Sequence, residues 1–137
     1  MKDSKICDQE FIQRFVFSGN VSSKGVIRPS AFLPQPIYPN ELSVYRTRDH
    51  CQEEMWAVGD EHVGKFHNPP RQVKASAEMS AGEVRKIRND VSSKFLELIA
   101  LSVPHRNHTN IENIQTTSPK DLLVAEKLLR ISKSIKR

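Results

Sequence analysis

The densest group of potentially reactive side chains lies in residues 104–110, which read Pro-His-Arg-Asn-His-Thr-Asn. A neutral imidazole can accept or donate a proton near neutral pH, and an arginine can bind an anion. With Arg14 and Arg46 as anion clamps and His108 as acid or base, this chemistry would suit a phosphate-bearing substrate. Such a site requires the three side chains to converge on one cleft within about 8–10 Å. The alternative is a polar surface loop with a chance cluster of histidines and arginine.

Standard catalytic and metal-binding signatures are missing from the sequence. It contains no G-x-x-x-x-G-K-[ST], no G-x-G-x-x-G, no G-x-S-x-G and no H-E-x-x-H pattern. The five histidines are scattered and the two cysteines, Cys7 and Cys51, are far apart, so we expect free thiols, no metal and no cofactor. No apolar run could span a bilayer and the first residues are unlike a signal peptide, so we expect a cytoplasmic protein without membrane contact.

The positive charge belongs to the second half of the chain. Residues 1–70 carry eight Lys and Arg against nine Asp and Glu, whereas residues 71–137 carry thirteen against seven. A basic half suggests a polyanionic partner, because clustered cations gain affinity by releasing phosphate counterions. Solvated helix faces are also rich in lysine, which is the alternative interpretation. The candidate contacts to a nucleic-acid backbone are Lys74, Arg85, Arg88 and Lys94.

Alternation of apolar and polar residues predicts a small sheet. Strands are expected over residues 13–18, 41–47 and 72–79. In the second of these, Leu42, Val44 and Arg46 fall on one face, and Ser43, Tyr45 and Thr47 fall on the other. An arginine that ends an apolar face is either a surface residue or an anion ligand that points into a cleft.

Helical spacing of apolar residues predicts three helices. The first spans Asp49–Val58 with Gly59 as its stop, and the second runs from Gly82 to about Ala100. Residues 95–103 are also compatible with a buried strand, although we favour the helix. The third helix starts at Ser118-Pro119 and ends near Ile135. Residues 104–117 between them are expected to form a polar loop.

Several short segments follow one another in a distinctive order: Arg14-Phe15, Arg28–Pro34, Leu42–Arg46, Met55–Gly59, Lys74–Ala77 and His108–Ile111. Together they resemble a family of small, uncharacterised prokaryotic proteins, over a region from Arg14 to about Leu129. Where the family pattern has a Gly-Trp pair, this chain has Asn113-Ile114. The resemblance implies one domain and no assigned activity, and it draws attention to Arg14, Arg46 and His108.

We therefore predict one α+β domain over residues 1–137, in which 1–12 and 134–137 fray at the ends. A small, largely antiparallel sheet from the first half would be covered by helices from the second, including a C-terminal helix. The leading functional hypothesis is a non-enzymatic accessory module whose basic half contacts nucleic acid or an acidic protein. The alternative is a small enzyme for phosphoryl or ADP-ribosyl chemistry on a phosphorylated or nucleotide substrate. A third possibility is a structural partner that docks through the apolar loop Phe32–Tyr38.

Overall fold

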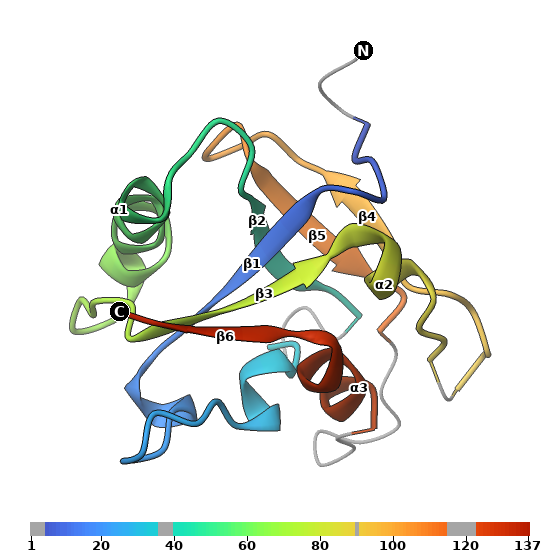
Figure 1. Cartoon of the computed structure of the whole chain (residues 1–137), viewed down its shortest axis with the longest axis horizontal. Helices are drawn as coiled ribbons and strands as arrows, with labels where there is room; N and C mark the ends of the chain where they lie inside the picture. Colours follow the sequence, from blue (N-terminus) through green and yellow to red (C-terminus); the bar gives the residue numbers. More distant parts are fainter. Residues whose placement is uncertain (1–4, 36–39, 90, 115–122) are drawn as a thin grey trace.

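The structure, a computed structural model, describes residues 5–35, 40–89, 91–114 and 123–137. A six-stranded antiparallel sheet with the order β4-β5-β2-β1-β3-β6 forms its centre (Figure 1). Its strands are β1 (Phe11–Val16), β2 (Leu42–Arg46), β3 (Ala75–Ser80), β4 (Glu97–Ala100), β5 (His108–Glu112) and β6 (Lys133–Lys136). The helices are α1 (Gln52–His62), α2 (Ala81–Arg85) and α3 (Leu123–Ile131). The predicted α+β domain with an antiparallel sheet and a C-terminal helix is confirmed. None of the helices in these residues combines the length and apolar character needed to cross a membrane.

Each face of the sheet is covered by a different set of elements. On one face, Val44 and Leu128 belong to a core that also contains residues of α2 and of the 3₁₀ helix Pro29–Phe32. On the other face, Tyr45 and Trp56 belong to a smaller core with α1. Figure 1 shows α1 and α3 on opposite sides of the sheet. Trp56 is therefore a core residue.

The strand predictions are confirmed with small shifts of their ends. The segment predicted at 41–47 forms β2, and its alternation separates the buried Leu42 and Val44 from Ser43 and Tyr45. This alternation assigns the residues of one short strand to two different environments, because successive side chains of a strand point to opposite faces.

The long helix predicted from Gly82 to about Ala100 is wrong. Helix α2 is short, and the chain turns at Asn89, whose Oδ1 accepts hydrogen bonds from the amides of Val91 at 3.1 Å and Ser92 at 2.7 Å. An asparagine side chain that bonds its own downstream backbone favours a turn over a continuing helix. The alternative of a strand within residues 95–103 is confirmed by β4.

The last part of the chain differs from the prediction at both ends. The polar loop expected over 104–117 contains β5. The terminal helix, expected to reach about Ile135, stops at the end of α3, and residues 134–136, where we expected fraying, pair with β3 as part of β6. Pairing with the free edge of β3 is a long-range contact that local periodicity does not report. The predicted helix start at Ser118 and Pro119 lies outside the described residues.

Helix α1 starts and ends later than the predicted span Asp49–Val58. Cys51 and Glu54 form a capping box at its start, which satisfies amides that have no partner within the helix. Gly59, expected as the stop, lies inside the helix, where a Cβ would lie 2.6 Å from Cγ2 of Val73. The glycine thus permits close packing of α1 on the chain before β3.

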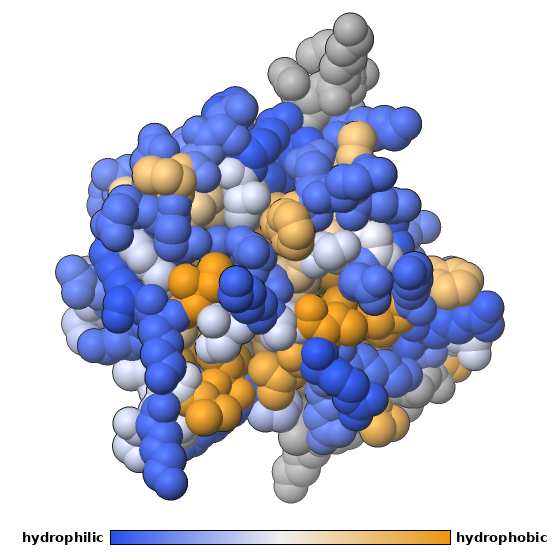
Figure 2. Space-filling model, viewed as in Figure 1, coloured by the Kyte–Doolittle hydropathy of each residue, from blue (hydrophilic) through white to orange (hydrophobic). Residues whose placement is uncertain are grey.

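The apolar loop considered as a docking segment is partly buried within the domain. Phe32 has no exposed surface and belongs to the larger core. Residues 36–39 of this loop lie outside the described residues. On the face of the molecule in Figure 2, apolar residues form several patches separated by hydrophilic side chains.

Candidate active site

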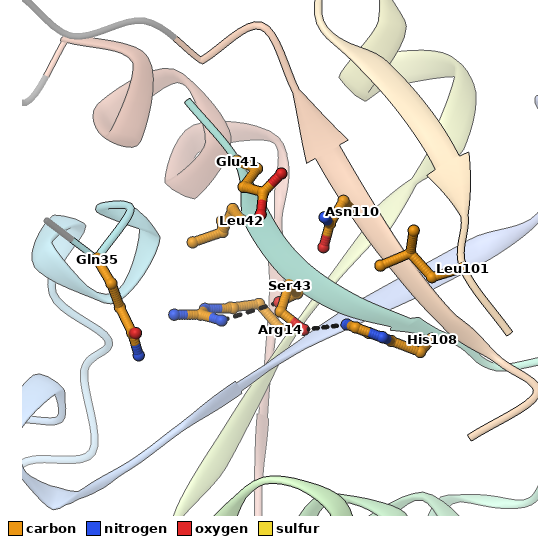
Figure 3. A pocket seen from close by; sticks show the side chains of 8 residues that line it. All are labelled: Arg14, Gln35, Glu41, Leu42, Ser43, Leu101, His108 and Asn110. Atoms are coloured by element: carbon orange, nitrogen blue, oxygen red, sulfur yellow. Dashed lines mark hydrogen bonds between the residues drawn. The ribbon is translucent and has the colours of Figure 1, made fainter. Parts of the chain in front are cut away.

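Ser43 on β2 and His108 on β5 are joined by a short hydrogen bond. The register of these neighbouring strands pairs Tyr45 with His108 and Ser43 with Asn110. Because directly paired residues of an antiparallel sheet project from the same face, the four side chains share one side of the sheet. Ser43 Oγ lies 2.6 Å from His108 Nε2, and Figure 3 shows the two side chains pointing toward each other. We call Ser43 and His108 the dyad.

The second nitrogen of His108 fixes the direction of this bond. His108 Nδ1 lies 2.5 Å from the main-chain oxygen of Val103. A carbonyl oxygen only accepts, so Nδ1 carries the proton, and in the neutral imidazole Nε2 is then an acceptor. The Ser43 hydroxyl therefore donates to His108. A hydroxyl, an imidazole and an acceptor that orients the imidazole form the arrangement that activates serine nucleophiles.

Tyr45 supports the dyad from within the smaller core. Its ring stacks on that of His108, with centroids 5.0 Å apart and planes at 26°. Burial raises the pKa of Tyr45 to about 12, against smaller lowering effects of a hydrogen bond with Ser43 and of the charge on Arg14. The phenol consequently stays neutral at physiological pH, and its ring limits the orientations open to the imidazole.

Arg14 places a positive charge beside Ser43, on the side away from His108. Its Nε donates to the main-chain oxygen of Ala31 at 3.0 Å, and its Nη1 donates to that of Ser43 at 2.8 Å. Burial lowers the pKa of Arg14 to about 10, so the guanidinium remains charged at neutral pH. Among the residues that the structure describes, Arg14 has no ion-pair partner and its Nη2 has no acceptor. The guanidinium can therefore bind an anion by donating a hydrogen bond from Nη2.

The pairing of β1 with β2 ends before Arg14. The two strands pair at Ile12 with Arg46 and at Gln13 with Tyr45. Past these pairs, the guanidinium of Arg14 takes the main-chain oxygen of Ser43 as its acceptor. A side chain thus bridges the strands beyond their last registered pair, next to the dyad.

Two adjoining cavities open onto these groups. The first, which we call the dyad pocket, has a volume of about 420 Å³ and is lined by Arg14, Gln35, Glu41, Leu42, Ser43, Leu101, His108 and Asn110 (Figure 3). Asn110 lies directly across the strands from Ser43, and within the described ranges its side chain has no hydrogen-bond partner. Glu41 also lines this pocket, and among the described residues it forms no ion pair with Arg14. The second, which we call the aromatic pocket, has a volume of about 580 Å³, shares Arg14, Gln35, Ser43 and His108 with the first, and is also lined by Phe17, Phe66 and His67.

Comparisons of the chain with protein-family models, curated proteins and solved structures found no match. The chemistry of the site is consequently inferred from its own geometry.

Arg46, the third member of the predicted anion site, is not in either pocket. It lies on the opposite face of β2 from Ser43, is 3% exposed, and binds Glu10 through Nε at 2.8 Å and Nη2 at 2.7 Å. It also donates to the main-chain oxygen of Lys5. The predicted convergence of Arg14, Arg46 and His108 is therefore wrong for Arg46, because a carboxylate that is distant in sequence holds it in a structural ion pair.

The residues before His108 serve to hold the loop rather than to line the dyad pocket. The His105 ring lies 5.0 Å from that of His62 and 5.5 Å from that of His50, and its Nδ1 accepts from the Asn107 amide. Burial, followed by the nearby His62 and His50, lowers the pKa of His105. Arg106 pairs through Nη2 with the carboxylate of Asp49, in the turn before α1, at 3.1 Å. In the described part of the chain, no group of three or more His, Cys, Asp or Glu residues could hold a metal ion.

Among the four predicted nucleic-acid contacts, Lys74 lies apart from the other three. Lys74 precedes β3, whereas α2 follows it, so the length of a six-residue strand, about 20 Å, separates Lys74 from Arg85. Arg85 is bound to Asp8 at 2.7 Å, and the Arg88 guanidinium lies 4.3 Å from the Phe95 ring centroid. Lys94 is exposed.

Sequence reasoning identified His108 and Arg14 but missed Ser43 and Asn110. A signal for both was present: His108, Asn110 and Glu112 alternate with Thr109 and Ile111 as in a strand. Assigning this segment to a loop removed the pairing that brings Ser43 to His108.

Proposed function

We propose that this protein is an enzyme that acts on a phosphorylated substrate, with Ser43 as nucleophile and His108 as general base. The observation that carries the proposal is the 2.6 Å hydrogen bond between Ser43 Oγ and His108 Nε2, in a pocket that also holds the Arg14 guanidinium. The carbonyl of Val103 orients the imidazole, the role that a carboxylate has in the Ser-His-Asp triad.

The charge of Arg14 favours a phosphoryl group over a neutral acyl group. A partly buried guanidinium without a carboxylate partner gains most from an anion, because charge-assisted hydrogen bonds are about twice as strong as neutral ones. Nη2 of Arg14 and the Asn110 amide supply donors on either side of Ser43 (Figure 3). Such donors would stabilise the negative charge on the transferring phosphoryl oxygens.

The proposed reaction has two displacement steps. Ser43 Oγ attacks phosphorus while its proton passes to His108 Nε2. The bond from phosphorus to the leaving oxygen breaks with its electron pair, and that oxygen takes the proton from His108. Water then attacks the phosphoseryl group, gives its proton to His108, and Ser43 leaves and recovers this proton.

A fluorophosphonate probe, read by intact mass and peptide mapping, tests the nucleophile. We expect one adduct on Ser43, no adduct in Ser43→Ala, and labelling slowed at least about 100-fold in His108→Ala, because the general base is lost. Ser23→Ala is the matched control, since Ser23 is exposed, lines neither pocket and should leave labelling unchanged. An unlabelled wild type, or an adduct on another residue, would refute the proposal.

A substrate panel identifies the transferred group. We expect turnover of p-nitrophenyl phosphate or bis(p-nitrophenyl) phosphate, and none of p-nitrophenyl acetate. Turnover of the acetate alone would replace phosphoryl with acyl chemistry. Consumption of NAD⁺ alone would favour ADP-ribosyl transfer, the other reaction that the sequence suggested.

The state of the cysteines supports a cytoplasmic location for this enzyme. Cys7 and Cys51 are both free and exposed. Reducing compartments keep exposed thiols unpaired, whereas oxidising compartments favour their pairing.

Contact with nucleic acid is a second candidate function, favoured by a basic groove at the edge of the sheet. Lys74, Lys136 and Arg137 line this groove of about 330 Å³, where β6 forms the edge beside β3. Lys74 is the one predicted contact that lies in the groove. An acidic protein could use the same cations, but clustered lysines also gain affinity for a phosphate backbone by releasing its counterions.

Fluorescence anisotropy with short DNA and RNA at two salt concentrations tests this candidate. We expect salt-sensitive binding that the double variant Lys74→Ala/Lys136→Ala weakens and makes less dependent on salt. The double variant Lys86→Ala/Lys94→Ala removes the same charge from exposed positions outside the groove and should have a smaller effect. Equal effects of the two variants, or no binding at low salt, would exclude the groove as a nucleic-acid site.

A further inference from the structure

We propose that the phosphorylated substrate is a nucleotide, with its phosphate on Arg14 in the dyad pocket and its base in the aromatic pocket beside Phe66. This inference rests on the proposed function, and it adds the identity of the group that the phosphate carries. The two pockets share Arg14, Ser43 and His108, so one ligand can occupy both.

The aromatic pocket has the size and lining of a small-molecule site. Its volume of about 580 Å³ falls within the roughly 300–1,000 Å³ typical of ligand pockets. Rings of Phe17, Phe66 and His67 line it, together with polar groups that include Asn20 and Ser30. Flat rings next to a phosphate site are the combination that binds a nucleobase by stacking.

Phe66 is available for such stacking. Its side chain is 73% exposed, more than any other large apolar side chain in the described residues. The His67 ring already packs against that of Phe17, with centroids 4.4 Å apart and planes tilted by 40°. A base placed against Phe66 would cover an exposed phenyl ring beside this preformed pair.

The backbone holds these rings in place before any ligand binds. Phe66 ends the 3₁₀ helix Gly64–Phe66, and the Gly64 oxygen accepts from the amides of His67 at 3.1 Å and Arg71 at 3.0 Å. A Cβ at residue 64 would lie 2.0 Å from the main-chain oxygen of Arg71, so only glycine permits this closure. A fixed loop loses little conformational entropy when a ligand binds.

The charge of the aromatic pocket also fits a nucleotide. Arg71 lines it in addition to Arg14 and donates to Ser18 Oγ at 3.3 Å. Burial, followed by the charges of Arg71 and Arg14, lowers the pKa of His67. His67 therefore presents a neutral ring at neutral pH, while the two arginines keep the pocket positive.

Isothermal titration calorimetry with AMP, ribose 5-phosphate and inorganic phosphate tests the inference. Stacking on one aromatic side chain should make AMP bind at least about tenfold more tightly than ribose 5-phosphate. Phe66→Ala should remove most of this preference and leave the affinity for ribose 5-phosphate unchanged. Phe11→Ala is the matched control, because Phe11 is 49% exposed at the start of β1 and does not line either pocket.

The outcomes separate the two proposals. Equal affinities for AMP and ribose 5-phosphate, or equal effects of Phe66→Ala and Phe11→Ala, would overturn the base site and leave the phosphate site intact. If none of the three compounds binds to the wild type, the phosphate site itself fails, and with it the proposed function.

Discussion

Replacing Ser43 with alanine is expected to lower the turnover number for a phosphorylated substrate by at least about 10⁴-fold, with KM changed by no more than a few-fold. The variant retains Arg14 and Asn110, the residues proposed to bind the substrate. It has no atom that can attack phosphorus. Steady-state kinetics on the best substrate of the panel measures both constants. The small change in KM distinguishes loss of the nucleophile from loss of the pocket.

His108→Ala and the double variant Ser43→Ala/His108→Ala complete this test. Residues that act as one unit have strongly non-additive effects, so the double variant should be no slower than Ser43→Ala. Ser23→Ala should keep the wild-type turnover number, because Ser23 lines neither pocket. If Ser43→Ala retains more than a tenth of the wild-type turnover number, Ser43 is not the nucleophile and the hydrogen bond to His108 is structural.

Replacing Glu10 with glutamine is expected to lower the free energy of unfolding by about 2–3 kcal/mol. Arg46 is only 3% exposed, and its ion pair with Glu10 has a 2.7 Å contact. The neutral amide would leave this guanidinium buried without its counter-charge. The expected loss of stability is smaller than for a fully buried ion pair because Glu10 is 20% exposed. Urea denaturation at neutral pH measures the loss.

The ion pair between Arg46 and Glu10 also makes the free energy of unfolding depend on pH. Burial raises the pKa of Glu10, but hydrogen bonds from Arg46 and the Cys7 amide, with the charges of Arg46 and Arg48, outweigh it, and the net pKa is lowered. A lowered pKa in the folded state means that the contribution is complete above the unfolded pKa, near 4.5, and is lost as pH falls through the folded pKa. Wild type should therefore lose more stability than Glu10→Gln between about pH 5 and pH 3.

An exposed ion pair provides the control for this prediction. Glu83 lies 3.4 Å from Lys86, and both side chains are at least half exposed, so Glu83→Gln should change stability by less than about 1 kcal/mol. The hydrogen bond from Arg137 lowers the pKa of Asp60. Asp60 therefore also contributes to the loss of stability in acid, and it does so equally in wild type and in Glu10→Gln. Identical pH slopes for wild type and Glu10→Gln would show that the pair does not stabilise the fold.

The sequence was a good guide to the fold where one local rule decided the outcome. Alternation in residues 41–47 predicted both β2 and the face that each side chain takes, because a two-residue period matches a strand and does not match a helix. Periodicity failed over residues 82–100, where the buried Val84 and Leu98 fit a helix yet belong to a short helix and a strand. The bonds from Asn89 that turn the chain there are not visible in hydrophobic spacing.

The candidate site was harder to predict because its parts are distant in sequence. Ser43 and His108 are 65 residues apart and meet only through the register of β2 and β5. Residue type alone pointed to His108 and to both arginines, but it could not distinguish Arg14, which faces the pocket, from Arg46, which Glu10 neutralises. Partners of this kind are set by topology, which composition and local spacing do not contain.

The division of the site between sheet and loop bears on how specificity could diversify. The dyad lies on β2 and β5, two inner strands of the sheet. A shift of their register by one residue would move their side chains to the opposite face. The rings of Phe66 and His67 belong instead to the segment 64–71, which contributes no strand to the sheet. Surface segments of this kind accept insertions and substitutions more readily than strands do. New ligand preferences could thus evolve through substitution of a few residues in this loop, while the dyad stays unchanged.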